Sequence, residues 1–320
     1  MTLSVPAKNG DISFWMADLG HVPVSEPLVT DAEADVVIVG AGYTGLWTAY
    51  YLAERDPSLS IVVLEQHRVG YGASGRNGGW LTNSITGGHD GYAAKHGAEA
   101  VRVFQNELNA TVDEVLAVCA REGIDAEATK GGSLLVARNE AQRRRIAKYV
   151  AHAEKWPEEG VIELSAAESR ARVNVADTRG GLWQPHCARI HPAKLAVGLA
   201  DAVRRRGVRI YENTRVTDIE QGVARTEHGL VRAQHVLRAT EGFTTRLPGK
   251  KREWLPLNSS MIITEPLTDD MWAEIGWQGF ETLEELSHVY AYAQRTPDGR
   301  IAIGGRGTPY HWASRFDTDG

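Results

Sequence analysis

The sequence DVVIVGAGYTG at residues 35–45 joins a short apolar run to a GxGxxG pattern. The run from Val36 to Val39 is continuous and β-branched, which is typical of a strand buried on both faces of a parallel sheet. The next segment, Leu46 to Arg55, favours a helix, and Ile61 to Leu64 favour a second buried strand. A strand, a glycine-rich turn, a helix and a second strand within about thirty residues predict a βαβ unit of the Rossmann type.

The three glycines of this pattern suit a dinucleotide. Gly40 permits the tight turn, Gly42 lets the backbone approach a pyrophosphate, and Gly45 allows the helix to pack closely on the sheet. The helix amino terminus adds unpaired N–H groups and about half a positive charge for the phosphates. Glu65 stands 20 positions after Gly45, at the end of the second strand, where a carboxylate binds ribose hydroxyls. The same charge would repel a 2′-phosphate, so the sequence favours NAD or FAD over NADP.

A second glycine-rich stretch, GASGRNGG at residues 72–79, follows the βαβ unit. Its small residues allow the backbone to lie against a flat ring system or a phosphate. Arg76 brings a planar cationic donor and Asn77 an amide. A nicotinamide enzyme has little need of such a loop, so the stretch favours FAD. An NAD-dependent dehydrogenase is kept as an alternative.

The composition excludes several other classes of protein. The chain has 320 residues, of which 42% are apolar and 24% charged, as in a folded globular protein. Its net charge of −6 gives no sign of a nucleic-acid partner. The uncharged segment from Val36 to Ala53 is interrupted by glycines, so no transmembrane segment is predicted. Cys119 and Cys187 are too few for a disulfide framework and indicate a reducing, cytoplasmic location. No histidines have HExxH spacing, and no metal is expected.

The segment from Asp35 to Trp80 resembles the FAD-dependent D-amino-acid oxidase superfamily, in which SGRNGG follows the dinucleotide motif. Within it, the chain is most similar to the bacterial branch that includes the γ-glutamylputrescine oxidases. Later stretches support the branch: His191-Pro192, ATEG at 239–242, SSM at 259–261, DGR at 298–300 and GGRG at 304–307.

This resemblance implies a set of FAD contacts. The glycine turn would hold the pyrophosphate, Glu65 the adenosine ribose and Val216 the adenine, while residues 72–79 would run beside the ribityl chain and the isoalloxazine. The residues expected to bind FAD are Gly40, Gly42, Tyr43, Thr44, Gly45, Glu65, Gln66, Gly72, Ala73, Ser74, Arg76, Asn77, Gly78, Gly79, Val216, Ala239, Thr240 and Gly242.

The resemblance also implies an activity, the oxidation of an amine or amino acid. A hydride would pass from the carbon bearing the nitrogen to flavin N5, and the imine would be hydrolysed. Molecular oxygen would reoxidise the flavin and give hydrogen peroxide, unless another electron acceptor does so. Tyr290, Arg295 and Arg306, which flank a glycine turn expected at Gly304, are the candidate substrate contacts, because an arginine can bind a carboxylate through paired hydrogen bonds. The alternative is that they are surface arginines and a core tyrosine.

The predicted fold class is α/β, with a Rossmann-like FAD-binding lobe interleaved with a mixed α+β substrate lobe. Phe14 and Trp15 are expected to hold an N-terminal arm on the body of the protein. The expected division is an arm at 1–30, the FAD-binding βαβ unit and loop at 31–90, helices and the start of the substrate lobe at 91–190, a return to the FAD-binding lobe at 191–245, and substrate-lobe strands at 246–320.

Two departures from the family pattern qualify this prediction. Glu241 stands where such proteins often have asparagine, and its carboxylate would repel a pyrophosphate unless it points away. Family members usually continue past the GGRG stretch with a segment that returns to the flavin, whereas this sequence stops at Gly320. We therefore expect that segment to be absent, and the alternative function is a truncated, catalytically inactive FAD- or nucleotide-binding fragment.

Overall fold

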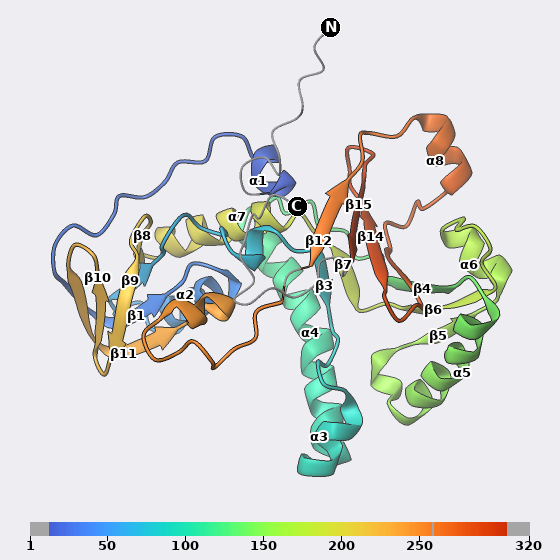
Figure 1. Cartoon of the computed structure of the whole chain (residues 1–320), viewed down its shortest axis with the longest axis horizontal. Helices are drawn as coiled ribbons and strands as arrows, with labels where there is room; N and C mark the ends of the chain where they lie inside the picture. Colours follow the sequence, from blue (N-terminus) through green and yellow to red (C-terminus); the bar gives the residue numbers. More distant parts are fainter. Residues whose placement is uncertain (1–12, 258, 306–320) are drawn as a thin grey trace, which may run out of the picture.

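The computed structural model of the chain describes residues 13–257 and 259–305. Two sheets form separate lobes, and the long helix α4 (Ala98–Glu122) runs between them (Figure 1). None of the helices in these ranges is both long enough and apolar enough to cross a lipid bilayer.

The first lobe is built on a six-stranded sheet with four parallel strands. Parallel pairing joins β8, β2, β1 and β11, and β10 and β9 continue the sheet in antiparallel order. Val39 is paired with both Leu64 and Arg238, so three parallel strands end at one edge of the sheet. Open sheets of this type bind ligands at that edge. The strand bounds are β1 Ala32–Val39, β2 Ile61–Leu64, β8 Arg209–Tyr211, β9 Val216–Glu220, β10 Val223–Thr226 and β11 Leu230–Arg238.

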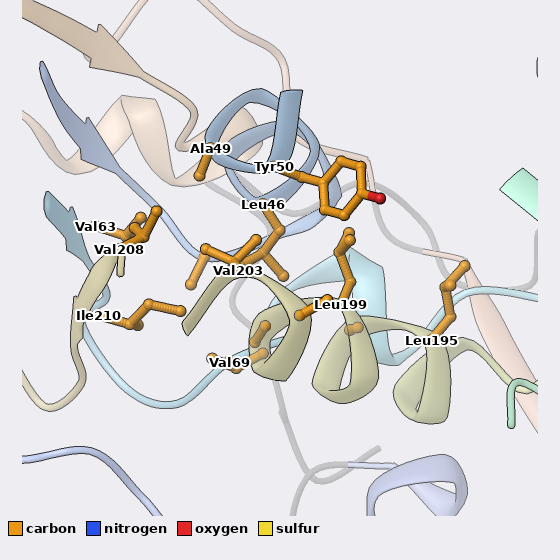
Figure 2. Packing of buried hydrophobic residues seen from close by; sticks show 14 of the residues in the cluster. Leu46, Ala49, Tyr50, Val63, Val69, Leu195, Leu199, Val203, Val208 and Ile210 are labelled. Atoms are coloured by element: carbon orange, nitrogen blue, oxygen red, sulfur yellow. The ribbon is translucent and has the colours of Figure 1, made fainter. Parts of the chain in front are cut away.

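The continuous apolar run of β1 reflects burial on both faces. Ile38 packs under α2 (Tyr43–Arg55) and α7 (Pro192–Arg205), where Leu46 and Leu199 point toward each other (Figure 2). Val37 faces the opposite way, into a second cluster with residues of β10 and β11. Burying one such leucine side chain stabilises the fold by about 1.5–3 kcal/mol.

The second lobe contains a seven-stranded mixed sheet in the order β12-β15-β14-β13-β4-β6-β5. Only β13 and β4 pair in parallel, and the other neighbours are antiparallel. Helices α5 (Glu140–Lys155), α6 (Ala166–Arg172) and α8 (Asp269–Ile275) belong to this lobe (Figure 1). The strand bounds are β4 Ser133–Ala137, β5 Ile162–Leu164, β6 Gly180–Gln184, β12 Ser260–Ile263, β13 Thr282–Glu285, β14 Ala291–Arg295 and β15 Ile301–Gly305.

The chain passes repeatedly between the lobes. It forms β1, α2 and β2 in the first lobe, β4 to β6 in the second, α7 to β11 in the first, and β12 to β15 in the second. A two-stranded sheet of β3 (Trp80–Thr82) and β7 (Cys187–Arg189) lies at the crossings. The predicted fold class, two interleaved lobes of α/β and mixed type, is thereby confirmed.

One local prediction is wrong. The sequence suggested a turn at Gly304, but Gly304 and Gly305 lie inside β15 and pair with both β12 and β14. Glycine is needed at position 304 for another reason. A Cβ atom there would lie 2.2 Å from Cζ of Tyr292, so the missing side chain makes room for the tyrosine ring.

The segment after residue 12 contacts the glycine-rich loop. In helix α1 (Phe14–Asp18), the buried Trp15 donates from Nε1 to the carbonyl of Asn77 at 3.0 Å. Ser13, which caps this helix, donates from Oγ to the carbonyl of Gly75 at 2.8 Å. The arm thus holds the backbone of residues 75–77 in place.

Glu122 joins the carboxyl end of α4 to the first lobe. Its carboxylate accepts from Arg206 at 2.5 Å, from Arg205 at 3.1 Å and from the hydroxyl of Tyr50 at 2.9 Å. The hydrogen bond from Arg206 is the main reason why the pKa of Glu122 is lowered to about 2. The ionised Glu122 carboxylate therefore stabilises the fold fully above its ordinary pKa near 4.5, and this stabilisation is lost as the pH falls toward 2.

We expect Glu122→Gln to lower the free energy of unfolding at pH 7 by about 1.5–3 kcal/mol, because charged hydrogen bonds are lost. The variant should also lose less stability than the wild type between pH 5 and pH 2. Urea unfolding across that range measures both effects. Glu114→Gln is the control, since the side chain of Glu114 on the same helix is 45% exposed. Equal effects of the two substitutions would contradict the prediction.

Candidate functional site

A cavity of about 150 Å³ lies at the edge where the parallel strands of the first sheet end. Its walls come from the turn after β1, the end of β2, the 72–79 loop, the start of β9 and the segment after β11. The expected FAD residues that line it are Gly40, Gly42, Tyr43, Thr44, Glu65, Gln66, Gly72, Ala73, Ser74, Val216, Ala239 and Thr240. Gly45, Arg76, Asn77, Gly78, Gly79 and Gly242 lie outside this wall.

The glycine turn leaves no space for side chains. A Cβ atom on Gly45 would lie 2.0 Å from the carbonyl oxygen of Gly40. Gly40 itself has φ +109° and passes so close to the residue that follows β11 that its Cβ would lie 2.4 Å from the carbonyl oxygen of Ala239. The backbone of the turn is thus exposed to the cavity, as a pyrophosphate requires.

Ser74 joins the glycine-rich loop to the start of α2. Its Oγ accepts from the backbone N–H of Tyr43 at 2.9 Å, and a Cβ on Gly42 would lie 3.0 Å from the same oxygen. The two glycine-rich segments are therefore in direct contact, although they are about thirty residues apart in sequence.

Glu65 is held in a fixed position at the end of β2. One carboxylate oxygen accepts from the N–H of Ala41 at 2.9 Å, and the other accepts from the N–H of His67 at 3.0 Å. Burial raises the pKa of this carboxyl group. Each oxygen retains capacity for a second hydrogen bond, so a ribose diol in the cavity could donate to both.

Glu241 lies in the wall of the small cavity with a left-handed backbone, φ 42°. Its carboxylate accepts a hydrogen bond from the N–H of Gly242. This conformation suits asparagine better than glutamate. The departure noted in the sequence thus coincides with a locally strained position.

A larger cavity, of about 710 Å³, lies between the other end of the 72–79 loop and the second sheet. Asn77 and Gly78 line it, whereas Gly72, Ala73 and Ser74 line the small cavity. The two ends of one loop therefore border different cavities. An elongated cofactor could lie along this loop with one end in each cavity.

The side chains of the loop hold its shape. Arg76 donates from Nε to the backbone carbonyl of Tyr71 at 2.6 Å, and its guanidinium lies 4.5 Å from the centre of the Tyr71 ring. Asn77 donates to the carbonyl of Ser74 at 3.0 Å and accepts from the N–H of Gly79 at 2.8 Å. The two polar residues of the motif thus order the backbone of the loop.

The loop packs directly on β14. A Cβ at Gly78 would lie 2.5 Å from the ring of Tyr292, and one at Gly79 would lie 1.9 Å from the amide of Gln294. The same amide donates to the carbonyl of Gly78 at 2.7 Å. The paired glycines are therefore required for contact between the lobes.

The candidate substrate residues do not all reach the large cavity. Tyr290 lines it, together with Tyr292. Arg295 does not: its Nη1 donates to the carbonyl of Trp277 at 3.0 Å, and its guanidinium lies 4.1 Å from the centre of the Trp272 ring. Side chains alternate along a strand, so an odd-numbered residue of β14 faces away from Tyr290 and Tyr292. The expectation that Arg295 contacts substrate is corrected on this ground. Arg306 lies outside the described residues.

We expect Arg295→Ala to destabilise the second lobe by about 1–2 kcal/mol, through lost contact with aromatic rings and a lost hydrogen bond. The KM for substrate should not change. Thermal unfolding and steady-state kinetics measure the two effects, with the exposed Arg143→Ala as control. If Arg295→Ala instead raised the KM for substrate and left the stability unchanged, Arg295 would be a substrate contact after all.

The far wall of the large cavity carries a cluster that sequence reasoning missed. His89, His152 and Glu159 offer ligand atoms within 4.8 Å of one another. Gln105 donates its amide N–H groups to Asn83 and Asn109, so its oxygen must accept from Nε2 of His89, at 2.9 Å. Nδ1 of His89 is then left to face Nε2 of His152 at 3.3 Å. The cluster can share a proton or hold a cation, and no spacing in the sequence signals it.

Comparison with known proteins agrees with this geometry. The family described as DAO, FAD-dependent oxidoreductase, matches residues 35–320. The chain is 32% identical to γ-glutamylputrescine oxidoreductase of Escherichia coli, over 92% of this chain and 69% of that protein. It is 30% identical to the probable oxidoreductase OrdL of Rhizobium meliloti, over 96% of this chain and 71% of that protein. The chain thus spans roughly two thirds of the length of these relatives.

Solved structures resemble the fold. Glycine oxidase from Geobacillus kaustophilus superposes with a TM-score of 0.65 at 22% identity, covering 88% of this chain and 73% of that one. L-amino acid deaminase from Proteus vulgaris superposes with a TM-score of 0.66 at 20% identity, covering 89% of this chain and 64% of that one. Together with the sequence matches, the paired glycine-rich segments show that the chain belongs to the DAO family of FAD-dependent oxidoreductases.

Proposed function

We propose that the chain binds FAD along the 72–79 loop and oxidises the C–N bond of an amine or amino acid held in the large cavity. The product would be an imine, with molecular oxygen reduced to hydrogen peroxide or another acceptor taking the electrons. Family membership makes the chain an oxidoreductase of the type that acts on such substrates. The observation that carries the proposal is the loop itself, which borders the small cavity at Gly72 and the large one at Gly78.

The residues present fit the cofactor. The turn at Gly40 offers bare backbone for the pyrophosphate, Glu65 offers fixed acceptors for the ribose, and Gly78, which has no side chain, borders the large cavity. FAD, when bound, supplies the acceptor for the hydride that leaves the carbon next to nitrogen.

The protein side of the reaction is binding, orientation and exclusion of water. The walls of the large cavity include apolar side chains of the second sheet, among them Leu135, Leu182 and Trp183. Such walls disfavour the charged form of a reacting amine and favour the neutral form that gives up a hydride. Tyr290 and Tyr292 add hydroxyl groups on the side nearer the loop.

A visible spectrum tests the proposal. The chain is purified, supplied with FAD, and mixed without oxygen with polyamines, D-amino acids and N-methyl amino acids. Bleaching of the flavin absorbance, followed by peroxide release in air, is expected for part of this panel. Bound flavin that no compound bleaches would favour the inactive fragment, and a colourless chain with nicotinamide-dependent turnover would favour a dehydrogenase.

A further inference from the structure

The wall of the large cavity contains a carboxylate without a partner in the described part of the chain. Glu284 on β13 is partly buried, and its side chain forms no hydrogen bond or ion pair with the residues described. Burial raises the pKa of this group. The next residue, Glu285, is held by Arg138 at 3.3 Å and Gln142 at 2.6 Å. A carboxylate removed from water costs free energy unless a cation joins it.

Glu284 lies at the loop end of the cavity. It is paired directly with Tyr292 across β13 and β14, so the two side chains share one face of the sheet. The Tyr292 ring in turn contacts Gly78 of the glycine-rich loop. The unpaired carboxylate is therefore on the wall of the site proposed for chemistry.

The other side chains in the described wall of the cavity that can carry a charge near neutral pH are either carboxylates, like Glu284, or histidines that already lie beside a carboxylate. The described lining contains Glu159 and Glu284 but no lysine or arginine. Glu159 lies 3.6 Å from His89 and 3.7 Å from His152, so these histidines have a carboxylate beside them. A substrate carboxylate would find no free cation among these residues, whereas a substrate ammonium would find an unpaired anion.

We propose that Glu284 binds an ammonium group of the substrate other than the reacting nitrogen and makes the cavity selective for such cationic amines over amino acids, an inference that rests on the function proposed above. The contact is a charge-assisted hydrogen bond from N⁺–H to a carboxylate oxygen, stronger than its neutral counterpart. Glu284 is thus a specificity-determining residue.

Matched substrates that differ only by a carboxylate test this selectivity. The pairs are putrescine with ornithine and cadaverine with lysine. We expect the wild type to favour the amine of each pair in kcat/KM. Glu284→Gln should raise the KM for the amines about tenfold or more, because a charged hydrogen bond is lost. Glu285→Gln, the same change on the opposite face of the strand, should keep the wild-type preference.

A binding measurement without turnover separates recognition from chemistry. Choline and 3,3-dimethylbutan-1-ol have the same shape and differ in charge, and Trp80 and Trp183 in the cavity wall report binding by fluorescence. The FAD-loaded wild type should bind choline about tenfold more tightly or better, and Glu284→Gln should remove the difference.

The outcomes distinguish the two proposals. If no compound reduces the flavin, the proposed function fails, while a charge preference that depends on Glu284 would still support the cation site. If the chain oxidises amino acids as well as amines, and Glu284→Gln changes neither KM nor choline binding, this inference is overturned and the proposed function stands. A preference for amino acids that Arg306→Ala removes would also overturn it.

Discussion

Gly45→Ala is expected to abolish retention of FAD and to destabilise the first lobe. The added methyl group would lie 2.0 Å from the carbonyl oxygen of Gly40 and 3.2 Å from a methyl group of Ile38. The nearest atom belongs to the backbone, so no side-chain rotation relieves the clash. Overpacking in a rigid core costs roughly 1–3 kcal/mol or more, and here the displaced backbone is the turn that faces the pyrophosphate. We expect affinity for FAD to fall by at least about 100-fold.

Flavin fluorescence titration and urea unfolding of the FAD-free chain measure these two losses. Gly91→Ala in α3 (His89–His96) is the matched control, because in the described part of the chain no atom beyond the neighbouring residues and the backbone of its own helix lies within 4 Å of its added Cβ. Alanine is favoured over glycine within helices by up to about 1 kcal/mol, so the control should be as stable as the wild type or more so. Wild-type affinity in Gly45→Ala would show that FAD does not bind at this turn.

Glu65→Gln is expected to weaken FAD binding by about 1.5–3 kcal/mol, the range for a hydrogen bond to a charged group. Both carboxylate oxygens of Glu65 accept from backbone N–H groups, of Ala41 and of His67. A glutamine has one oxygen, so its NH₂ group must face one of these donors and cannot accept from a ribose hydroxyl. The substitution therefore removes the negative charge, one acceptor for a ribose hydroxyl, and one of the two backbone hydrogen bonds that hold the side chain in place.

The measurement is an FAD titration at pH 8, where the raised pKa of Glu65 matters least because the carboxyl group is most fully ionised. Asp35→Asn provides the control, since Asp35 lies within β1 but outside the wall of the small cavity, and its carboxylate accepts hydrogen bonds from Ser60. It should bind FAD as the wild type does. Unchanged affinity in Glu65→Gln would mean that the ribose assignment is wrong.

The elements predicted best are those whose sequence pattern has a local cause. The strand Ile61–Leu64 has the predicted bounds, because four apolar residues buried on both sides leave no other solution. Local causes also act at helix ends: Ser165 and Glu168 form a capping box at the start of α6, and the side chain of His191 caps α7. The strand β7 was not predicted. Cys187–Arg189 has three residues, too few to show a period, and exists through pairing with Trp80–Thr82.

The large cavity could be predicted less well than the small one, because its wall is assembled by tertiary contacts. His89 and His152 are 63 positions apart, and no motif joins them. Glu284 looks in sequence like Glu285, yet one faces the cavity and the other Arg138. The error at Arg295 has the same origin: proximity to Tyr290 in sequence suggested a shared face, which strand alternation does not allow.

The parallel pairing of β1 with β11 also determines when this protein can take up its cofactor during translation. Ala32 pairs with Val231, and the wall of the small cavity extends to Leu247. A nascent chain released at residue 200 would carry both glycine-rich segments but lack the strand that completes their sheet. The ribosome must therefore deliver the chain at least to Leu247 before the small cavity is complete, and until β11 has emerged the apolar β1 lacks one of its two neighbouring strands.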